Sequence, residues 1–138
     1  MTTRARRRAA ACFLAFFLAA GFSCASSGGA ELGKPFTLKV GESASFEGGK
    51  LVMKFVSVPE DSRCPKGEQC VWAGNARVVL EVSKPAQAPQ TVQLNTSRGP
   101  RDAELDGLVL KLESLDPEPS SSRRLRPEDY SVVLILGQ

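Results

Sequence analysis

Residues 76–83 read ARVVLEVS, and this stretch sets the expectation for the fold. Apolar side chains recur at every second position from Ala76 to Val82, with Arg77 and Glu81 at alternate positions. A period of two places side chains on one face of a β-strand. The segment Lys84-Pro85-Ala86 should end the strand, because proline has no N–H to donate to a ladder. We therefore predict a strand over 76–83.

Similar short apolar alternations occur through the rest of the chain, near 36–40, at Phe46, and over 51–58, 92–94, 108–112 and 130–136. The 51–58 segment is apolar on both faces, which predicts a central strand. About seven strands in roughly 105 residues indicate an all-β fold, an antiparallel β-sandwich, with a small partly open β-barrel as the alternative. Two long connections are expected, over 97–107 and 116–129.

The first 23 residues have the composition of an export signal. Arginines near the N-terminus precede an apolar run from Ala9 to Ala20, and small residues follow. This order is typical of a secretory signal peptide, and the run is shorter than the roughly 20 residues of a membrane span. An uncleaved membrane anchor is the alternative.

Gly21-Phe22-Ser23-Cys24 resembles a bacterial lipobox, in which a cysteine after a small residue receives a lipid. Lipidation of Cys24 would leave two unmodified cysteines in the exported protein, Cys64 and Cys70, which is an even number. We expect a lipoprotein-type signal peptide over 1–23, a lipidated Cys24 with a flexible tether over 24–34, and a β domain over 35–138. The resemblance favours attachment to the outer membrane, facing the periplasm or the surface; a soluble periplasmic form is the alternative.

Charge and composition argue against several function classes. The chain has 18 Lys and Arg against 15 Asp and Glu. Four of the arginines lie before Cys24, so the remainder carries 18 − 4 = 14 basic and 15 acidic residues, a net charge of −1. This balance disfavours nucleic-acid binding, which requires a sustained basic surface. The chain has no histidine, which disfavours metalloenzymes and Ser-His or Cys-His hydrolases. We therefore expect no enzyme activity, no cofactor and no metal site.

Residues 60–76 read EDSRCPKGEQCVWAGNA and form the most distinctive motif. Five residues separate Cys64 from Cys70, and Pro65 and Gly67 favour the tight turn that a disulfide between them requires. The first interpretation is a staple between two strands. The second is a binding loop on a rigid ring, with Arg63, Lys66 and Trp72 as contact residues.

The motif resembles that of a family of small, uncharacterised bacterial envelope proteins and lipoproteins that share DSRCP followed by CVWAGN. The resemblance covers 17 residues closely and the strand layout loosely. It implies an exported β domain with a cysteine loop, and it implies no activity.

A second candidate surface is the basic cluster in the connection before the last strand, Arg123, Arg124 and Arg126. Three guanidinium groups could hold phosphate or carboxylate groups of an anionic envelope polymer. A solvated loop with acidic neighbours is the alternative.

Taken together, these features predict an exported lipoprotein that acts as a non-enzymatic binding or interaction module of the cell envelope. Its expected partners are the membrane, through the lipid anchor, and an envelope protein or anionic polymer. A protease or enzyme inhibitor and a passive structural lipoprotein are the alternatives.

Overall fold

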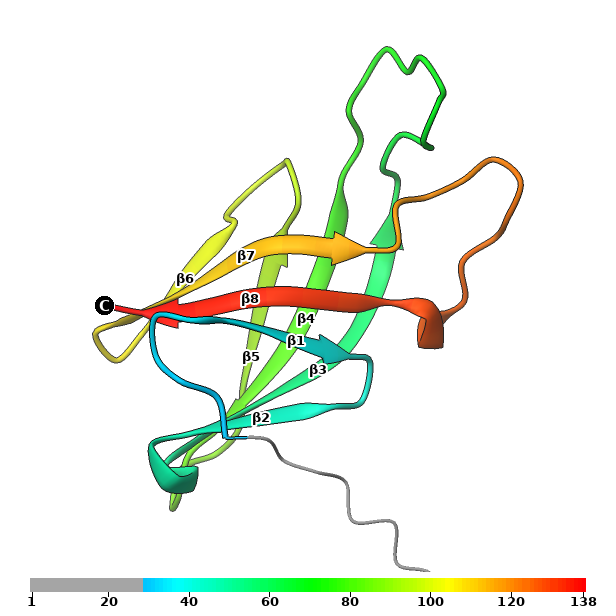
Figure 1. Ribbon diagram of the computed structural model, residues 1–138. Coiled ribbons are helices and arrows are strands. Elements are labelled where there is room, and N and C mark those ends of the chain that lie inside the picture. The colour runs from blue at the N-terminus through cyan, green and yellow to red at the C-terminus, as the bar shows by residue number, and fades with distance from the viewer. Residues whose placement is uncertain (1–28) are drawn as a thin grey trace, which may run out of the picture.

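The computed structural model describes residues 29–138, which fold into eight strands in two antiparallel sheets (Figure 1). The expected signal peptide, Cys24 and the start of the expected tether lie outside the described residues. One sheet has the strand order β1-β8-β7-β6 and the other β2-β3-β4-β5. Their bounds are β1 Pro35–Lys39, β2 Ser43–Phe46, β3 Leu51–Asp61, β4 Ala76–Ser83, β5 Gln90–Asn95, β6 Asp102–Leu105, β7 Leu108–Asp116 and β8 Ser131–Gly137.

The sheets do not close into a barrel, so the β-sandwich prediction is confirmed. Within the described residues no α-helix forms; two short 3₁₀ turns, η1 (Glu47–Gly49) and η2 (Pro127–Asp129), lie between strands. None of the helical segments there is long and apolar enough to cross a membrane.

The core lies between the two sheets and follows the period of two. In β4 every second side chain from Ala76 to Val82 is buried, as predicted. Phe36 of β1 and Phe46 of β2 meet edge to face across the sheets, with ring centroids 5.0 Å apart. Among the described residues, every residue buried in the core between the sheets is hydrophobic, so this core contains no polar network.

Strand β3 is central in its sheet, as predicted, but only one of its faces is buried. Met53 and Phe55 are fully buried, whereas Val56 on the opposite face is exposed. The strand also continues past Val58 to Asp61, through Pro59. Proline is accepted there because the pairing with β4 is irregular between Ser57 and Glu60, where no ladder N–H is required.

Two features were not expected from the sequence. Strand β6 (Asp102–Leu105) lies within the connection predicted over 97–107, and its short acidic sequence DAEL gives little strand signal. A register shift between Leu112 and Ser114 in β7 allows Leu115 to point inward like Leu112, three residues earlier.

The described part of the expected tether is held against the sandwich. Gly29 pairs with Ser45 of β2, the Ala30 N–H donates to the Ser45 carbonyl at 2.9 Å, and Gly33 donates to Leu136 at 2.7 Å. Residues 29–34 are therefore bonded to both sheets of the sandwich, through β2 and β8.

Candidate functional site

Three long connections gather at one end of the sandwich, which we call the loop end. They are the β3–β4 loop (62–75), the β5–β6 loop (96–101) and the β7–β8 loop (117–130), and the β3–β4 loop protrudes farthest (Figure 1). Antiparallel strands alternate in direction, so every second connection falls at the same end. The topology thus brings together segments that are far apart in the sequence.

The stem of the β3–β4 loop continues the pairing of β3 and β4. The Ser62 N–H donates to the Asn75 carbonyl at 2.8 Å, and the Cys64 N–H donates to the Ala73 carbonyl at 3.2 Å. The Ser62 hydroxyl donates to the same Asn75 carbonyl at 3.0 Å and accepts the Asn75 N–H at 3.1 Å. Ser62 is therefore engaged in holding the two arms of the loop together.

Gly74 is required in this stem by both conformation and space. Its φ of +69° lies in the left-handed region, and a Cβ at this position would lie 1.8 Å from the Ser62 carbonyl oxygen. Only glycine allows the two arms to approach so closely.

A disulfide joins Cys64 to Cys70 and closes the tip of the loop, as predicted. Inside the ring the Glu68 N–H donates to the Pro65 carbonyl at 3.1 Å, and Gly67 has a φ of +86°. These features are those of a type II turn, which places glycine at its third position. The ring is also attached to the β7–β8 loop, since the Lys66 N–H donates to the Pro119 carbonyl at 2.9 Å.

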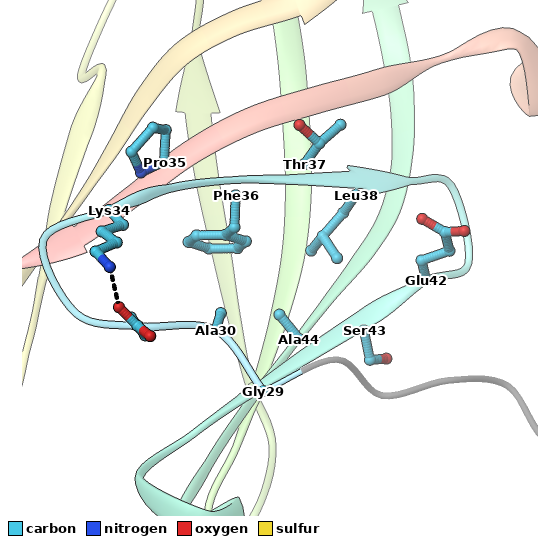
Figure 2. A pocket seen from close by; sticks show the side chains of 11 residues that line it. Gly29, Ala30, Lys34, Pro35, Phe36, Thr37, Leu38, Glu42, Ser43 and Ala44 are labelled. Carbon is cyan, nitrogen blue, oxygen red and sulfur yellow. Dashed lines mark ion pairs between the residues drawn. The ribbon is translucent and has the colours of Figure 1, made fainter.

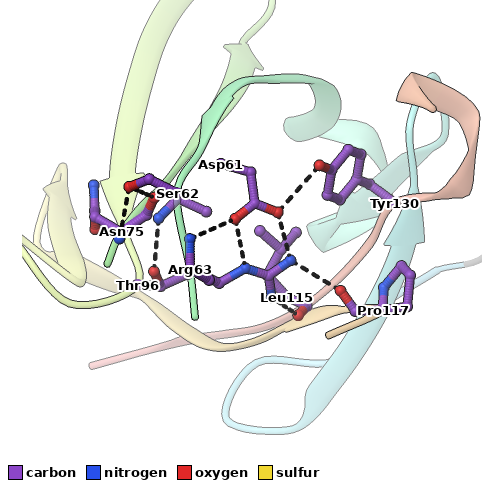
Figure 3. A network of polar contacts seen from close by, with 9 residues as sticks. Asp61, Ser62, Arg63, Asn75, Thr96, Leu115, Pro117 and Tyr130 are labelled. Atoms are coloured by element: carbon purple, nitrogen blue, oxygen red, sulfur yellow. Dashed lines mark hydrogen bonds and ion pairs between the residues drawn. The ribbon is translucent and has the colours of Figure 1, made fainter. Parts of the chain in front are cut away.

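Arg63 points into the loop end and joins the β3–β4 loop to the end of β7 and to the β7–β8 loop (Figure 3). Its guanidinium forms a two-point pair with Asp61, at 2.9 Å from Nε to Oδ1 and 2.7 Å from Nη2 to Oδ2. It also donates to the carbonyls of Leu115 at 2.6 Å and Pro117 at 2.9 Å. The Tyr130 hydroxyl donates to Asp61 Oδ2 at 3.1 Å. The Arg63 side chain is only 13% exposed, so it acts as a clamp that holds segments of the domain together. The sequence alone predicts Arg63 as an exposed residue that contacts a partner.

The electrostatics of this network favour its ionised form. Burial opposes ionisation of Asp61, but the hydrogen bonds and positive charge of Arg63, with the Tyr130 hydroxyl, outweigh it, so the pKa of Asp61 lies below its usual value. Burial and the neighbouring Asp61 carboxylate raise the pKa of Tyr130. At neutral pH the pair is charged and the tyrosine keeps its proton.

Asn75 connects the stem to the β5–β6 loop. Its side-chain oxygen accepts the N–H groups of Ser97 at 3.1 Å and Arg98 at 3.0 Å, while its amide donates to Asn95 at 2.9 Å. The Ser97 hydroxyl donates to the Gly74 carbonyl. This arrangement holds the Arg98 guanidinium over the Trp72 ring, 5.6 Å from its centroid. The sequence analysis did not predict this contact, because the two residues lie in different loops.

Two of the predicted contact residues of the β3–β4 loop are exposed. The Lys66 side chain extends into solvent and lies 3.6 Å from the Glu118 carboxylate. Trp72 is 70% exposed, and Val71 beside it is 91% exposed. Val71 was not singled out from the sequence, although an apolar residue next to tryptophan in a loop is a usable signal.

The basic cluster of the β7–β8 loop is largely paired within the loop. Arg123 lies 2.8 Å from Asp129, and Arg126 lies 3.3 Å from both Glu128 and Asp129. The Arg126 N–H is the main cause of a lowered pKa at Asp129, which keeps that carboxylate ionised. Arg124 is exposed and forms no ion pair with any of residues 29–138. The acidic neighbours therefore reduce the positive charge available to an anionic polymer.

A separate shallow cleft of about 470 Å³ lies between the edge strands β1 and β2 (Figure 2). Phe36, Leu38 and Ala44 form its apolar wall. Its charged groups interact locally: Glu31 pairs with Lys34, and Glu42 accepts the Lys39 N–H at 2.8 Å. The cleft could therefore contact an apolar group, but its charged side chains are engaged locally and would select a particular ligand only weakly.

Within residues 29–138 no three His, Cys, Asp or Glu side chains lie close enough to hold a metal ion. No protein-family model, curated protein or solved structure matches this chain. The most distinctive surface feature of the described residues is the loop end, where the exposed Trp72 lies beside Arg98.

Proposed function

We propose that this protein is an exported lipoprotein, anchored through Cys24, whose β-sandwich is a non-enzymatic interaction module of the bacterial cell envelope. The observation that carries the proposal is the rigid β3–β4 loop, which holds two large apolar side chains in solvent. Export to an oxidising compartment is consistent with the disulfide in the loop. The outer membrane is the proposed location, facing the periplasm or the surface.

The loop end suits binding because its loops are already ordered in the free protein, so little conformational entropy remains to be lost. A flexible loop loses conformational freedom when it binds, and a loop held in its bound shape loses less. Here the disulfide, the Arg63 clamp and the Asn75 hydrogen bonds fix the loop before any partner arrives.

The proposal is tested by comparing the two ends of the sandwich in living cells. A benzoylphenylalanine photocrosslinker replaces Arg124 at the loop end in one variant and Asp106, at the opposite end, in a second. We expect a discrete protein adduct from position 124 and none from position 106. Equal, diffuse labelling from both positions would indicate a passive lipoprotein and refute the proposal.

Lipid attachment has its own test, the intact mass of protein extracted from the membrane. We expect the mass of the chain from Cys24 onward, with acyl groups added and two hydrogens lost to the disulfide. A mass without acyl groups would assign the soluble periplasmic form.

A protease inhibitor is a second candidate, favoured by the protrusion of a disulfide-closed loop (Figure 1). Lys66 and Gly67 form the middle of a tight turn, which does not present the extended backbone that lies along a protease cleft. Assays of trypsin-like and chymotrypsin-like proteases with excess protein test this candidate. Full activity would exclude inhibition of these two classes.

A further inference from the structure

Val71 and Trp72 stand apart from every other apolar side chain on the described surface. Among residues 29–138 the remaining exposed large hydrophobic residues are Leu32, Val56 and Val109, which are 39–40% exposed and separated in sequence. Scattered half-exposed residues of this kind are ordinary. Two adjacent side chains at 91% and 70% exposure on one loop tip are not.

The loop has little freedom to bury these side chains by rearranging. Trp72 follows the disulfide at Cys70 by two residues and precedes Gly74, whose backbone lies against the Ser62 carbonyl. Both ends of the exposed segment are thus fixed, and the indole is held in solvent as part of the native structure.

Arg98 adds a positive charge to this apolar tip. Its backbone is fixed by Asn75, and its guanidinium lies 5.6 Å from the indole centroid. None of the ion pairs among residues 29–138 includes Arg98. Tryptophan and arginine are the residue types most enriched among interface positions that dominate binding energy. A carboxylate near the edge of the indole would complete the pairing of Arg98.

From these observations we propose that Trp72 inserts into an apolar pocket of an envelope protein, and that a carboxylate at the rim of that pocket pairs with Arg98. This inference rests on the proposed function and names the partner surface for the same site. Val71 packs at the mouth of the pocket. We call Val71, Trp72 and Arg98 the anchor.

Two observations favour a protein over a lipid surface as the partner. The positive charges of Arg98 in the anchor and of Lys66 at the same end of the sandwich are balanced by the exposed Glu68 and Glu118, so this end lacks the excess of basic residues that anionic lipids attract. The anchor also lies at the end of the sandwich opposite to Gly29, the first described residue (Figure 1).

The separation of these two ends follows from the strand register. Gly29 pairs with Ser45, which pairs with Val52 near the start of β3, whereas the β3–β4 loop begins after Asp61. Nine residues of extended chain cover about 30 Å. A domain held to a membrane by the few residues between Cys24 and Gly29 would therefore direct the anchor away from that membrane.

Trp72 is the only tryptophan in the chain, so its fluorescence reports on the anchor directly. The first step places a photocrosslinker at Val71 in the full chain in cells and identifies the protein attached. The second step titrates the purified exported protein with that purified partner. We expect a blue shift of the tryptophan emission on binding.

Variants then separate the anchor from other contacts. Trp72→Ala should weaken binding at least 30-fold, the loss typical of a dominant interface residue. Arg98→Glu should weaken it about tenfold or more, with Arg98→Lys retaining part of the affinity. Val109→Ala, at an exposed apolar residue of strand β7, is the matched control and should bind within about twofold of the parent. Circular dichroism confirms that each variant is folded.

Other results would contradict either the anchor or the proposed function, as follows. A partner that binds Trp72→Ala as tightly as the parent refutes the anchor and leaves the proposed function standing. Crosslinking from neither Val71 nor Arg124 refutes both. A blue shift with vesicles of phosphatidylethanolamine and phosphatidylglycerol, without any protein partner, assigns the anchor to lipid and refutes the inference.

Discussion

Replacing Gly74 with alanine should separate the arms of the β3–β4 loop, and Gly48→Ala supplies a matched control. Both glycines have a φ of +69°, so both substitutions impose the same unfavourable backbone conformation. A Cβ at Gly48 meets no atom within 4 Å, whereas one at Gly74 would lie 1.8 Å from the Ser62 carbonyl oxygen. The difference between the two variants therefore measures the close approach alone.

The magnitude follows from the bonds that the displaced backbone would lose. The left-handed conformation costs an alanine about 1 to 2 kcal/mol, which is the whole effect expected for Gly48→Ala. At Gly74 the Ser62 carbonyl must also move by more than 1 Å to reach an ordinary contact, and three hydrogen bonds join Ser62 to Asn75. At about 0.5 to 1.5 kcal/mol for each bond, their loss adds roughly 2 to 4 kcal/mol.

Urea unfolding of the oxidised protein, followed by far-ultraviolet circular dichroism, provides the free energies. Tryptophan emission is a poor probe here, because Trp72 is already 70% exposed in the folded state. Gly74→Ala should lower the free energy of unfolding by at least about 2 kcal/mol more than Gly48→Ala. Equal losses in the two variants would show that Gly74 is needed only for its φ angle, and the steric argument would be refuted.

Three further predictions concern the clamp, the staple and pH. Arg63→Met leaves the Asp61 carboxylate, 8% exposed, without its cationic partner. We expect the free energy of urea unfolding to fall by about 3 kcal/mol, against less than about 0.5 kcal/mol for the exposed Arg124→Met. A fall below about 1 kcal/mol for Arg63→Met would show that the clamp is dispensable. Replacing Cys64 and Cys70 with serine should cost about 2.4 kcal/mol under the same conditions, and unchanged stability would mean that the ring is held without the bond. The folded-state pKa of Asp61 lies below its unfolded value, so its contribution to the free energy of unfolding is complete above the unfolded pKa near 4 and disappears as pH falls through the folded pKa. Urea unfolding measured between neutral and acidic pH should show this loss of stability in the parent and a weaker loss in Arg63→Met. Identical pH dependences in the two proteins would contradict the role given to the Asp61–Arg63 pair.

Local sequence patterns predicted the architecture well because alternation is a property of neighbouring residues. The burial of every second residue in β4 follows from the alternation in ARVVLEVS, residues 76–83. The strand ends before Pro85 because proline has no N–H to donate to the ladder. The short strand β6 was missed, because its sequence DAEL has too few apolar residues to predict a strand. It forms a strand through its pairing with the neighbouring β7.

The contacts of the loop end depended on topology and could not be derived in the same way. Arg63 bonds carbonyls 52 and 54 residues away, and Asn75 holds Arg98 from 23 residues away. The sequence placed Arg63 and Trp72 in one motif and suggested one role for both. The fold gave them opposite roles, since Arg63 turns inward to the β7–β8 loop and Trp72 faces solvent.

By itself, then, the sequence determined the all-β class, most of the strands and the cysteine pair, since each depends on spacing within a few residues. Only the tertiary structure decided which side chains meet at the loop end, because antiparallel connections bring distant segments to the same end of the sheets. The exposed anchor of Val71, Trp72 and Arg98 exists only after two loops from different parts of the chain have been placed side by side.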